Sequence, residues 1–226
     1  MSDIKNIEQH YSLDERPFLE KVRGFCQLVD DRYSPYLTDF LNPREIQIVE
    51  ELAHYYNLKF FVSSTPESEE YGRVILAPEY YELDDEDFEI KRLEISYARQ
   101  FNKLTHPKVL GALINQLGLD RQVFGDIILD EEGRVQFSIA SHLASYAIMT
   151  ITKIGNVSVT LKEVSKDDWI SNQENYSQSF VLLSSMRLDN VLATVLNLSR
   201  SNALKLIASG KVKLNLDKLR RLIRRL

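Results

Sequence analysis

The middle of the chain, residues 88–164, changes its hydrophobic period in a regular order, and this order limits the fold more than any other feature. Some segments have an apolar residue at every second position, which is typical of strands. They alternate along the chain with segments in which apolar residues recur every three or four positions, which is typical of helices. Strands are predicted at 89–97, 125–129, 134–139 and 157–163, helices at 107–117 and 141–154, and a turn at Glu131-Glu132-Gly133. The order of these elements predicts a ferredoxin-like βαββαβ domain over residues 85–165.

Residues 1–80 predict a smaller N-terminal α/β unit, rich in helix. Apolar residues recur at helical spacing from about Ile7 to Tyr56, with an interruption at Ser34-Pro35. Asn42-Pro43 is typical of a helix start. Asn caps the first turn, and Pro is tolerated at the first helical position because the N–H it lacks would have no partner within the helix. Strands are predicted at 58–63 and 72–77. The whole chain is therefore predicted to be of the α+β class.

The last segment, residues 181–226, contains two short predicted helices. The first would be capped by Ser184 and Ser185 and would carry an apolar stripe of Leu188, Val191, Leu192 and Val195. The second would be capped by Ser199, bury Ala203, Leu204 and Ile207, and end at Gly210. Alternation at Val212 and Leu214 predicts the start of a strand.

Charge is distributed unevenly along the chain. Residues 181–226 contain ten Lys and Arg and two Asp, a net charge of +8. Because the whole chain carries −5, residues 1–180 carry −13. A basic end on an otherwise acidic chain favours binding to a polyanion.

The polar residues outside the two apolar stripes are the candidate binding residues. Lys and Arg can contact phosphates, and Ser and Asn can donate to phosphate oxygens and 2′-hydroxyls. The candidates are Arg187, Asn190, Ser199, Arg200, Ser201, Asn202, Lys205, Lys211 and Lys213. Asp189 is interpreted as structural, pairing with a basic neighbour or with the helix start.

The same segment resembles a known RNA-binding domain. The residues that carry the resemblance are Arg187-Leu188-Asp189, Leu192, Ser199-Arg200, Ala203, Ile207, Gly210, Val212 and Asn215. They resemble the domain named after small-subunit ribosomal protein S4, which implies two helices packed on a small sheet and binding to RNA by shape. Such domains continue with further strands, whereas residues 216–226 predict a short basic helix, so we expect the closing strands to be missing. This helix would extend the RNA surface or, less favoured because eleven residues anchor weakly, lie on a membrane.

The middle segment carries a second resemblance, to the bacterial YlmH family. The matching residues are His106, Gly111, Ala112, Leu113, Gly118, Arg121, Gly125, Asp126 and Ile127. The resemblance implies association with the large ribosomal subunit and peptidyl-tRNA during rescue of stalled ribosomes, and a genomic link to cell division.

Two questions about the middle domain stay open. Binding of RNA on its sheet needs aromatic residues on the central strands, and only Phe137 is present on the third strand, so a scaffold role is favoured. His106, Arg121 and Asp126 flank the first helix of this domain. They are as well placed to meet RNA as to cap helices and fix turns.

Other classes of site are disfavoured by composition. Cys26 is the single cysteine and is interpreted as a packed helix residue rather than a nucleophile. The four histidines form no ligand pair, so no metal site is predicted. The run of acids at 84–87 is interpreted as a solvated domain boundary rather than a cation site. No apolar run approaches the roughly 20 residues needed to span a bilayer.

The sequence therefore predicts a cytoplasmic, monomeric RNA-binding adaptor that docks on structured ribosomal RNA or tRNA, with no catalytic residues, metal or cofactor. One alternative is an accessory protein of RNA modification, because S4-type domains accompany pseudouridine synthases. The other is a cell-division scaffold that acts through protein contacts.

Overall fold

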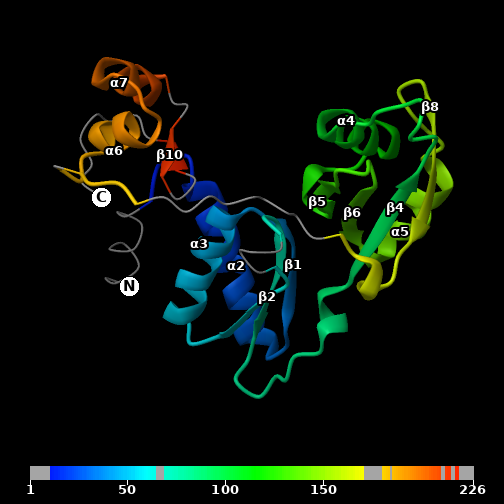
Figure 1. Cartoon of the computed structure of the whole chain (residues 1–226). Coiled ribbons are helices and arrows are strands. Elements are labelled where there is room, and N and C mark those ends of the chain that lie inside the picture. The colour runs from blue at the N-terminus through cyan, green and yellow to red at the C-terminus, as the bar shows by residue number, and fades with distance from the viewer. Residues whose placement is uncertain are drawn as a thin grey trace. The chain divides into compact units, whose positions relative to one another are not determined.

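The alternation predicted for the middle of the chain is present in the structure, a computed structural model that describes residues 11–64, 69–170, 180–183, 185–209, 212–214 and 217–218 (Figure 1). The chain forms two compact units, Met1–Gln173 and Glu174–Leu226. None of the helices in the described ranges is long and apolar enough to cross a membrane.

The middle of the first unit is a four-stranded antiparallel sheet with two helices. Its elements are β4 (Ile90–Ser96), α4 (His106–Leu117), β5 (Phe124–Leu129), β6 (Val135–Ala140), α5 (Ser141–Thr150) and β9 (Thr160–Glu163). The strands lie in the order β5-β6-β4-β9, which is the order of a ferredoxin-like domain and confirms that prediction. Gly133, at φ +78°, lies in the turn predicted between β5 and β6.

The second helix of this domain is shorter than predicted. Instead of continuing to residue 154, α5 ends at Thr150, and a small hairpin follows, made of β7 (Lys153–Ile154) and β8 (Val157–Ser158). Gly155 adopts φ +59° in its turn. The β-branched residues before that glycine favour strand over helix, and the apolar periodicity of this stretch did not show it.

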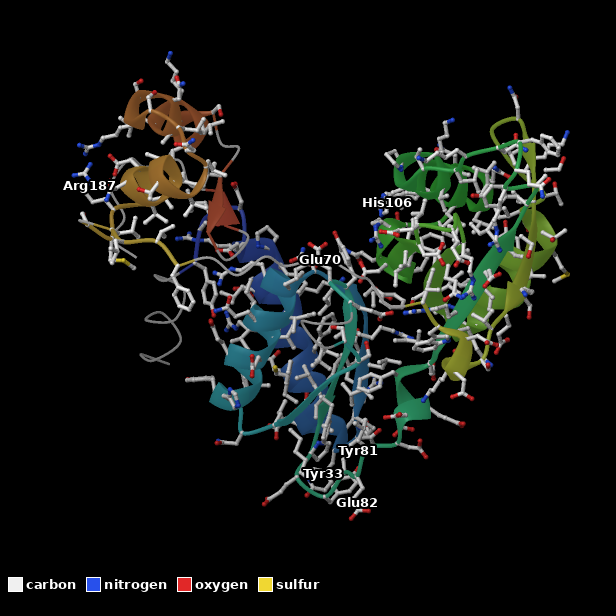
Figure 2. The ribbon with its side chains drawn as sticks, viewed as in Figure 1. Tyr33, Glu70, Tyr81, Glu82, His106 and Arg187 are labelled. Carbon is white, nitrogen blue, oxygen red and sulfur yellow. The ribbon has the colours of Figure 1, made fainter. Side chains whose placement is uncertain are left out.

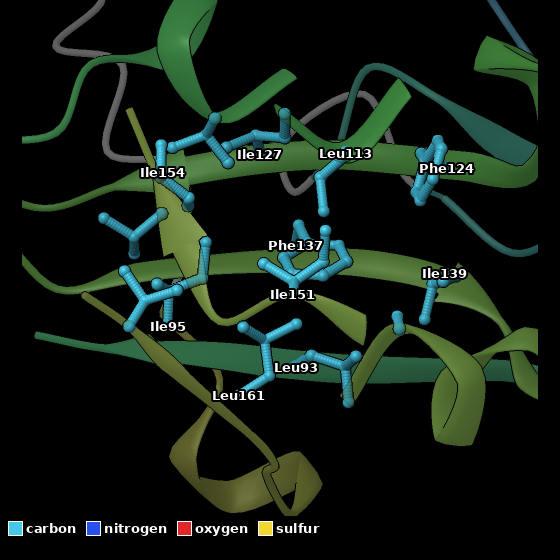
Figure 3. Close-up of a cluster of buried hydrophobic side chains, with 14 of the residues drawn as sticks. Leu93, Ile95, Leu113, Phe124, Ile127, Phe137, Ile139, Ile151, Ile154 and Leu161 are labelled. Atoms are coloured by element: carbon cyan, nitrogen blue, oxygen red, sulfur yellow. The ribbon is translucent and has the colours of Figure 1, made fainter. Parts of the chain in front are cut away.

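Both helices pack on one face of the sheet and enclose the larger core (Figure 3). Phe137, on the central strand β6, is fully buried and contacts Phe124 edge to face, with ring centroids 6.3 Å apart. The other residues at the centre of this core include Leu93, Ile95, Val109, Leu113, Ile139, Ala147, Ile151 and Leu161. The single aromatic residue that the sequence placed on the third strand is therefore a core residue and not a surface for stacking bases.

The N-terminal part of the first unit contains α2 (Arg16–Arg32), β1 (Tyr36–Leu41), α3 (Pro43–Tyr55), β2 (Lys59–Val62) and β3 (Gly72–Ala77). The prediction of helix across residues 36–41 is wrong, because this stretch pairs with β3 in an antiparallel sheet of order β1-β3-β2. Pro35 ends the helical run, and the aromatic and β-branched residues that follow favour a strand. Asn42 caps α3 as predicted, accepting from Arg44 N and Glu45 N at 3.0 Å each.

Cys26 lies on the buried side of α2, in a core shared by α2, α3 and the sheet. Its side chain is fully buried, and burial raises the pKa of its thiol to about 11. The interpretation of Cys26 as a packing residue is therefore confirmed, since a thiol with this pKa carries almost no thiolate at neutral pH.

The acidic run at residues 84–87 makes a local turn. It forms the short 3-10 helix η1 (Asp85–Phe88), in which Asp84 accepts from Glu86 N at 3.2 Å and Asp87 accepts from Asp84 N at 2.9 Å. These carboxylates satisfy backbone donors at the start of the domain, as capping residues do.

Close contacts join the two sheets of the first unit. The Arg73 guanidinium, on β3, donates to the carbonyl oxygens of Phe88 and Glu89 at 2.9 and 3.0 Å. Gly125, on β5, lies so near Phe40 that a Cβ at position 125 would be 2.7 Å from the ring atom Cε1. Only glycine fits here without a shift of β1 or β5.

The second unit contains α6 (Leu188–Val195), α7 (Arg200–Ala208), β10 (Lys213–Leu214) and β11 (Asp217–Lys218). Leu188, Leu192, Ile207 and Val212 form its small core. The second predicted helix is confirmed, since Ser199 Oγ accepts from Asn202 N and Ala203 and Ile207 are buried. Gly210, predicted to end it, lies outside the described residues.

Two predictions for this unit are wrong. The first helix begins at Leu188 and not after Ser185, and Val195 at its end is 55% exposed rather than buried. Residues 217–218 form a strand that pairs antiparallel with β10, where a helix and no closing strand were predicted. The spacing of apolar residues in so short a segment fits both structures. The rest of the predicted basic helix lies outside the described residues.

Candidate nucleic-acid interface

Two arginines of the second unit are held by one buried carboxylate. Asp189, on α6, is 1% exposed and pairs with Arg187 through Nε at 3.1 Å and with Arg200 through Nε at 2.7 Å. Hydrogen bonds from Arg187, and then from Arg200, lower the pKa of Asp189 to about 2. The interpretation of Asp189 as a structural acid with basic partners is confirmed.

The pairing leaves both guanidinium groups available. The Arg187 side chain is 40% exposed and the Arg200 side chain is 61% exposed, and Figure 2 shows Arg187 at the surface of α6. Each guanidinium has five N–H donors, so a pair that uses one or two of them leaves the others for an outside acceptor. Asp189 thus fixes on one surface two arginines that lie at the N-terminal ends of α6 and α7.

The start of α7 adds neutral donors beside these arginines. Ser199, Arg200, Ser201 and Asn202 are all exposed in or next to its first turn, and the hydroxyls of Ser199 and Ser201 are 3.0 Å apart. The N-terminal end of a helix carries partial positive charge and unpaired N–H groups, which favour an anion. Together these groups can bind a phosphate.

The remaining candidates are placed less closely. Lys205 is exposed in the last turn of α7. The Asn190 amide donates to the Ser185 carbonyl at 3.0 Å, so part of its hydrogen-bonding capacity is used inside the unit. Lys213 belongs to β10, while Lys211 and the side chain of Lys213 lie outside what the structure describes.

Comparison with known proteins identifies both parts of this arrangement. Residues 84–168 match the model of the putative RNA-binding domain in YlmH, and residues 186–221 match the S4 domain. The chain is 32% identical over 212 residues to ribosome-associated protein quality control protein P2 of Bacillus subtilis, covering 94% of this chain and 82% of that protein. The chain belongs to the YlmH family.

A solved structure supports the assignment to YlmH. The cell division protein YlmH from Streptococcus pneumoniae superposes with a TM-score of 0.64 at 40% identity, over 72% of this chain and 98% of the other. The match to the S4 domain extends to residue 221, which agrees with the presence of β11 and corrects the expectation of a domain without closing strands.

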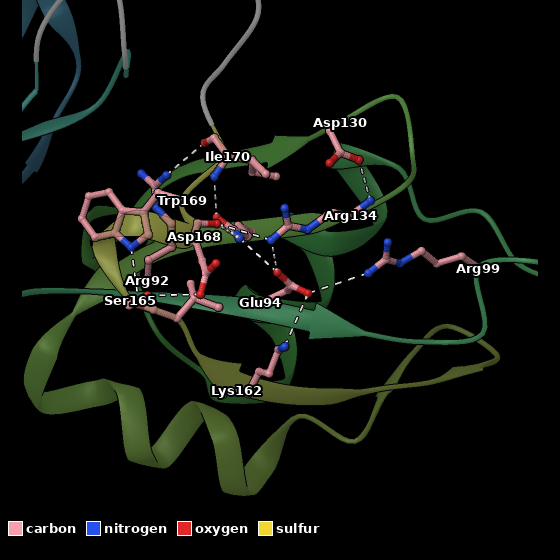
Figure 4. A network of polar contacts seen from close by, with 12 residues as sticks. Arg92, Glu94, Arg99, Asp130, Arg134, Lys162, Ser165, Asp168, Trp169 and Ile170 are labelled. Atoms are coloured by element: carbon pink, nitrogen blue, oxygen red, sulfur yellow. Dashed lines mark hydrogen bonds and ion pairs between the residues drawn. The ribbon is translucent and has the colours of Figure 1, made fainter.

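The YlmH domain also carries a polar network that the sequence reasoning missed. Arg92 and Glu94 on β4, and Gln136 and Ser138 on β6, lie on the sheet face opposite the helices and are at most 5% exposed. Glu94 pairs with Arg134 at 2.7 Å, Arg99 at 3.7 Å and Lys162 at 3.8 Å (Figure 4). The signal was the alternation of polar residues, at i and i+2, on two central strands.

A short segment covers this face. Residues Ser165–Ile170, here named the strap, include the 3-10 turn η3 (Lys166–Asp168) and lie over β4 and β6 (Figure 4). The Arg92 guanidinium lies over the Trp169 ring, and its Cζ atom is 4.2 Å from the centroid of that ring. Trp169 therefore anchors the strap, and it covers the face that a sheet-binding RNA domain would use.

The residues that flank α4 fix local structure. The Asp126 carboxylate accepts from the backbone N–H groups of Glu70 and Tyr71, and the Arg121 guanidinium lies 4.2 Å from the centroid of the Tyr71 ring. Burial raises the pKa of Asp126. Of the two interpretations left open, the structural one fits Arg121 and Asp126. His106 occupies the first position of α4, where Figure 2 marks it.

Within the described residues, no group of three or more His, Cys, Asp or Glu side chains is arranged to hold a metal ion.

Proposed function

We propose that this YlmH-family protein is an RNA-binding adaptor that docks on structured ribosomal RNA or tRNA through its S4 domain. The observation that carries the proposal is the pair of exposed arginines, Arg187 and Arg200, which one buried carboxylate holds on the same surface. Side chains held in place lose less conformational entropy on binding than free ones, so this surface is prepared for phosphates spaced along a folded RNA.

The setting we propose is the large ribosomal subunit with peptidyl-tRNA, during rescue of stalled ribosomes in the cytoplasm. Support comes from the Bacillus subtilis relative, whose name describes a ribosome-associated protein of quality control. The net charge of −13 on residues 1–180 opposes contact of that part with RNA backbone, whereas the +8 on residues 181–226 favours it. We propose that the protein acts as a monomer whose C-terminal end contacts folded RNA.

We also propose that the protein is not an enzyme. Asp189, the acid that holds the two arginines of the proposed RNA surface, has a pKa of about 2. A carboxylate that stays ionised at neutral pH is a poor proton donor or acceptor for RNA chemistry.

The test of the adaptor function is the double substitution Arg200→Ala with Lys205→Ala, measured by filter binding to ribosomal RNA. We expect at least a tenfold loss of affinity and a fall of about 1 to 2 in the slope of log affinity against log salt. Lys21→Ala with Arg32→Ala is the matched control, because it removes one exposed Lys and one exposed Arg from α2. An equal loss in both variants would show that net charge alone sets the affinity, and unchanged binding in the first would refute the proposal.

The second candidate is a cell-division scaffold, favoured by the description of the Streptococcus pneumoniae structure as a cell division protein. A scaffold that acts through protein contacts would keep its effect on division when Arg200 and Lys205 are replaced. Complementation of a deletion strain with the same double variant therefore separates the two functions.

A further inference from the structure

The polar face of the YlmH domain's sheet is covered by its own chain. Residues Ser165–Ile170 lie over Gln136 and one side of Arg92, while Glu69 pairs with Arg92 and accepts from Ser138 at 3.4 Å. The helices α4 and α5 pack on the opposite face. Burying polar groups costs free energy unless partners are present, and the strap backbone supplies two partners to Gln136 and one acceptor to Arg92. The strap behaves as a ligand that the chain supplies to itself.

The strap is bound mainly through its backbone. The Gln136 side-chain amide donates to the Asp168 carbonyl at 2.9 Å and accepts from the Ile170 N–H at 3.0 Å. Arg92 donates to the Ile170 carbonyl at 3.2 Å. Gln136 thus binds one acceptor and one donor of the strap with a single amide. The edge of a nucleobase also presents a neighbouring donor and acceptor, and Gln and Asn bind it through the same two hydrogen bonds.

The stacking contact also has an equivalent in RNA recognition. Trp169 lies against the Arg92 guanidinium, and unstacked bases bind in the same way on the guanidinium planes of arginines. Arg92 is 3% exposed, and no described residue pairs with its Nε. A buried donor without an acceptor is costly, so the strap leaves unsatisfied a group that a different ligand can satisfy.

Cations line the edge of the covered face. The side chains of Arg134, Arg99 and Lys162, which pair with Glu94, are 29%, 36% and 62% exposed. Their exposed N–H groups can contact the phosphates of a nucleotide bound on this face, and positive charge there favours phosphate over an uncharged peptide.

We propose that this face is a binding site for single-stranded RNA that the strap keeps closed, with Trp169 and the strap backbone in the place of a base. The proposal rests on the proposed function in that the ligand is RNA, but it concerns a different part of the chain. An unpaired nucleotide displaces the strap and meets Arg92 and Gln136. Because the closed form predominates, the apparent affinity of the wild-type chain is reduced by the fraction that is open.

The experiment uses the full chain and a fluorescein-labelled ten-nucleotide oligoadenosine or oligouridine, with binding followed by anisotropy. Trp169→Ala removes the stacking contact and Ile170→Pro removes the N–H that Gln136 accepts, so both open the face. We expect either variant to bind the oligonucleotide about tenfold more tightly than the wild type, since a buried cation–π contact is worth about that factor. Gln136→Ala added to Trp169→Ala should abolish the gain, and Trp169→Phe should stay within about twofold of the wild type.

The outcomes separate this proposal from the previous one. Trp169→Ala should increase the affinity for the oligonucleotide even when Arg200 and Lys205 are also replaced. The affinity for folded ribosomal RNA should fall in that combined variant. An unchanged affinity in both opening variants, with native circular dichroism, would overturn the proposal. A gain that survives Gln136→Ala, or tighter binding of an unstructured peptide instead of the oligonucleotide, would overturn it too.

One measurement needs no variant. Hydrogen exchange of the strap amides in the wild-type chain should accelerate when saturating oligonucleotide is added, because the Ile170 N–H loses its partner. Should the opening variants fail to fold, unchanged exchange in this measurement is the result that rejects the site.

Discussion

Each unit contains a charged side chain that is buried and paired with an opposite charge, and the two units use that pair in opposite ways. In the first unit Arg92 pairs with Glu69, and the two side chains are 3% and 9% exposed. In the S4 domain Asp189 is equally buried, yet its partners Arg187 and Arg200 are 40% and 61% exposed. The first arrangement satisfies charges inside the protein, while the second fixes charges for a partner outside it. The exposure of the cations, and not the presence of an ion pair, marks a surface that is open to RNA without a change of conformation.

The largest effect should come from removing the acid of the covered network. Glu94→Ala leaves Arg134 and the buried Gln136 amide without their shared acceptor, and we expect a loss of about 1–3 kcal/mol in the free energy of unfolding. Urea denaturation measures it. Glu163→Ala, which breaks an exposed pair with Lys91, is the control and should cost less than about 1 kcal/mol. Equal costs would mean that the network contributes no more than a surface pair.

An intermediate effect is expected for the acid of the S4 domain. Asp189→Asn keeps the size of the side chain but releases Arg187 and Arg200, so affinity for folded ribosomal RNA should fall about fivefold, the equivalent of about 1 kcal/mol. The substitution also raises the net charge by one, which alone would increase affinity. Filter binding shows whether the release of the arginines or the rise in net charge has the larger effect on affinity. Tighter binding would contradict the role of Asp189 in orienting the arginines.

The smallest effect should be that of pH. The pKa of Asp189 is about 2 in the folded protein and 3.8 for an unperturbed Asp. A carboxyl with a lowered pKa contributes stability that is complete above the unfolded value and is lost as pH falls from about 4 towards 2. RNA affinity should therefore show no step from Asp189 between pH 8 and 5. NMR titration of its carboxyl carbon should give a midpoint near 2, and a midpoint near 4 would show that the arginines do not hold it.

Much of this organisation could be predicted from local sequence. The order of strands and helices in the middle domain followed from hydrophobic period, and the start of α3 followed from Asn42-Pro43. The pairing of Asp189 with basic neighbours was also anticipated, because an acid in so basic a segment has few other partners. These features depend on residues that are close in sequence.

What could not be predicted depends on distant residues. The strand at residues 36–41 is set by its pairing with β3, some 35 residues later, and local periodicity contains no trace of that partner. The strap lies on β4 although about 70 residues separate them, so neither the burial of Arg92 nor its contact with Trp169 could be read from spacing. The short strand β11 was missed because two paired residues are too few to show a period.

The contact between Gly125 and Phe40 bears on how this family could have arisen. Residues 84–168 match one domain model, which suggests a module that evolution can move between proteins. Yet Gly125 in this segment leaves a space that the Phe40 ring fills, and the carbonyl groups of Phe88 and Glu89 accept hydrogen bonds from Arg73. Phe40 and Arg73 both belong to the preceding sheet. A gene fusion that carried the segment alone would inherit a gap and two unpaired acceptors. The unit that can be inherited intact is thus the pair of sheets, and not residues 84–168 alone.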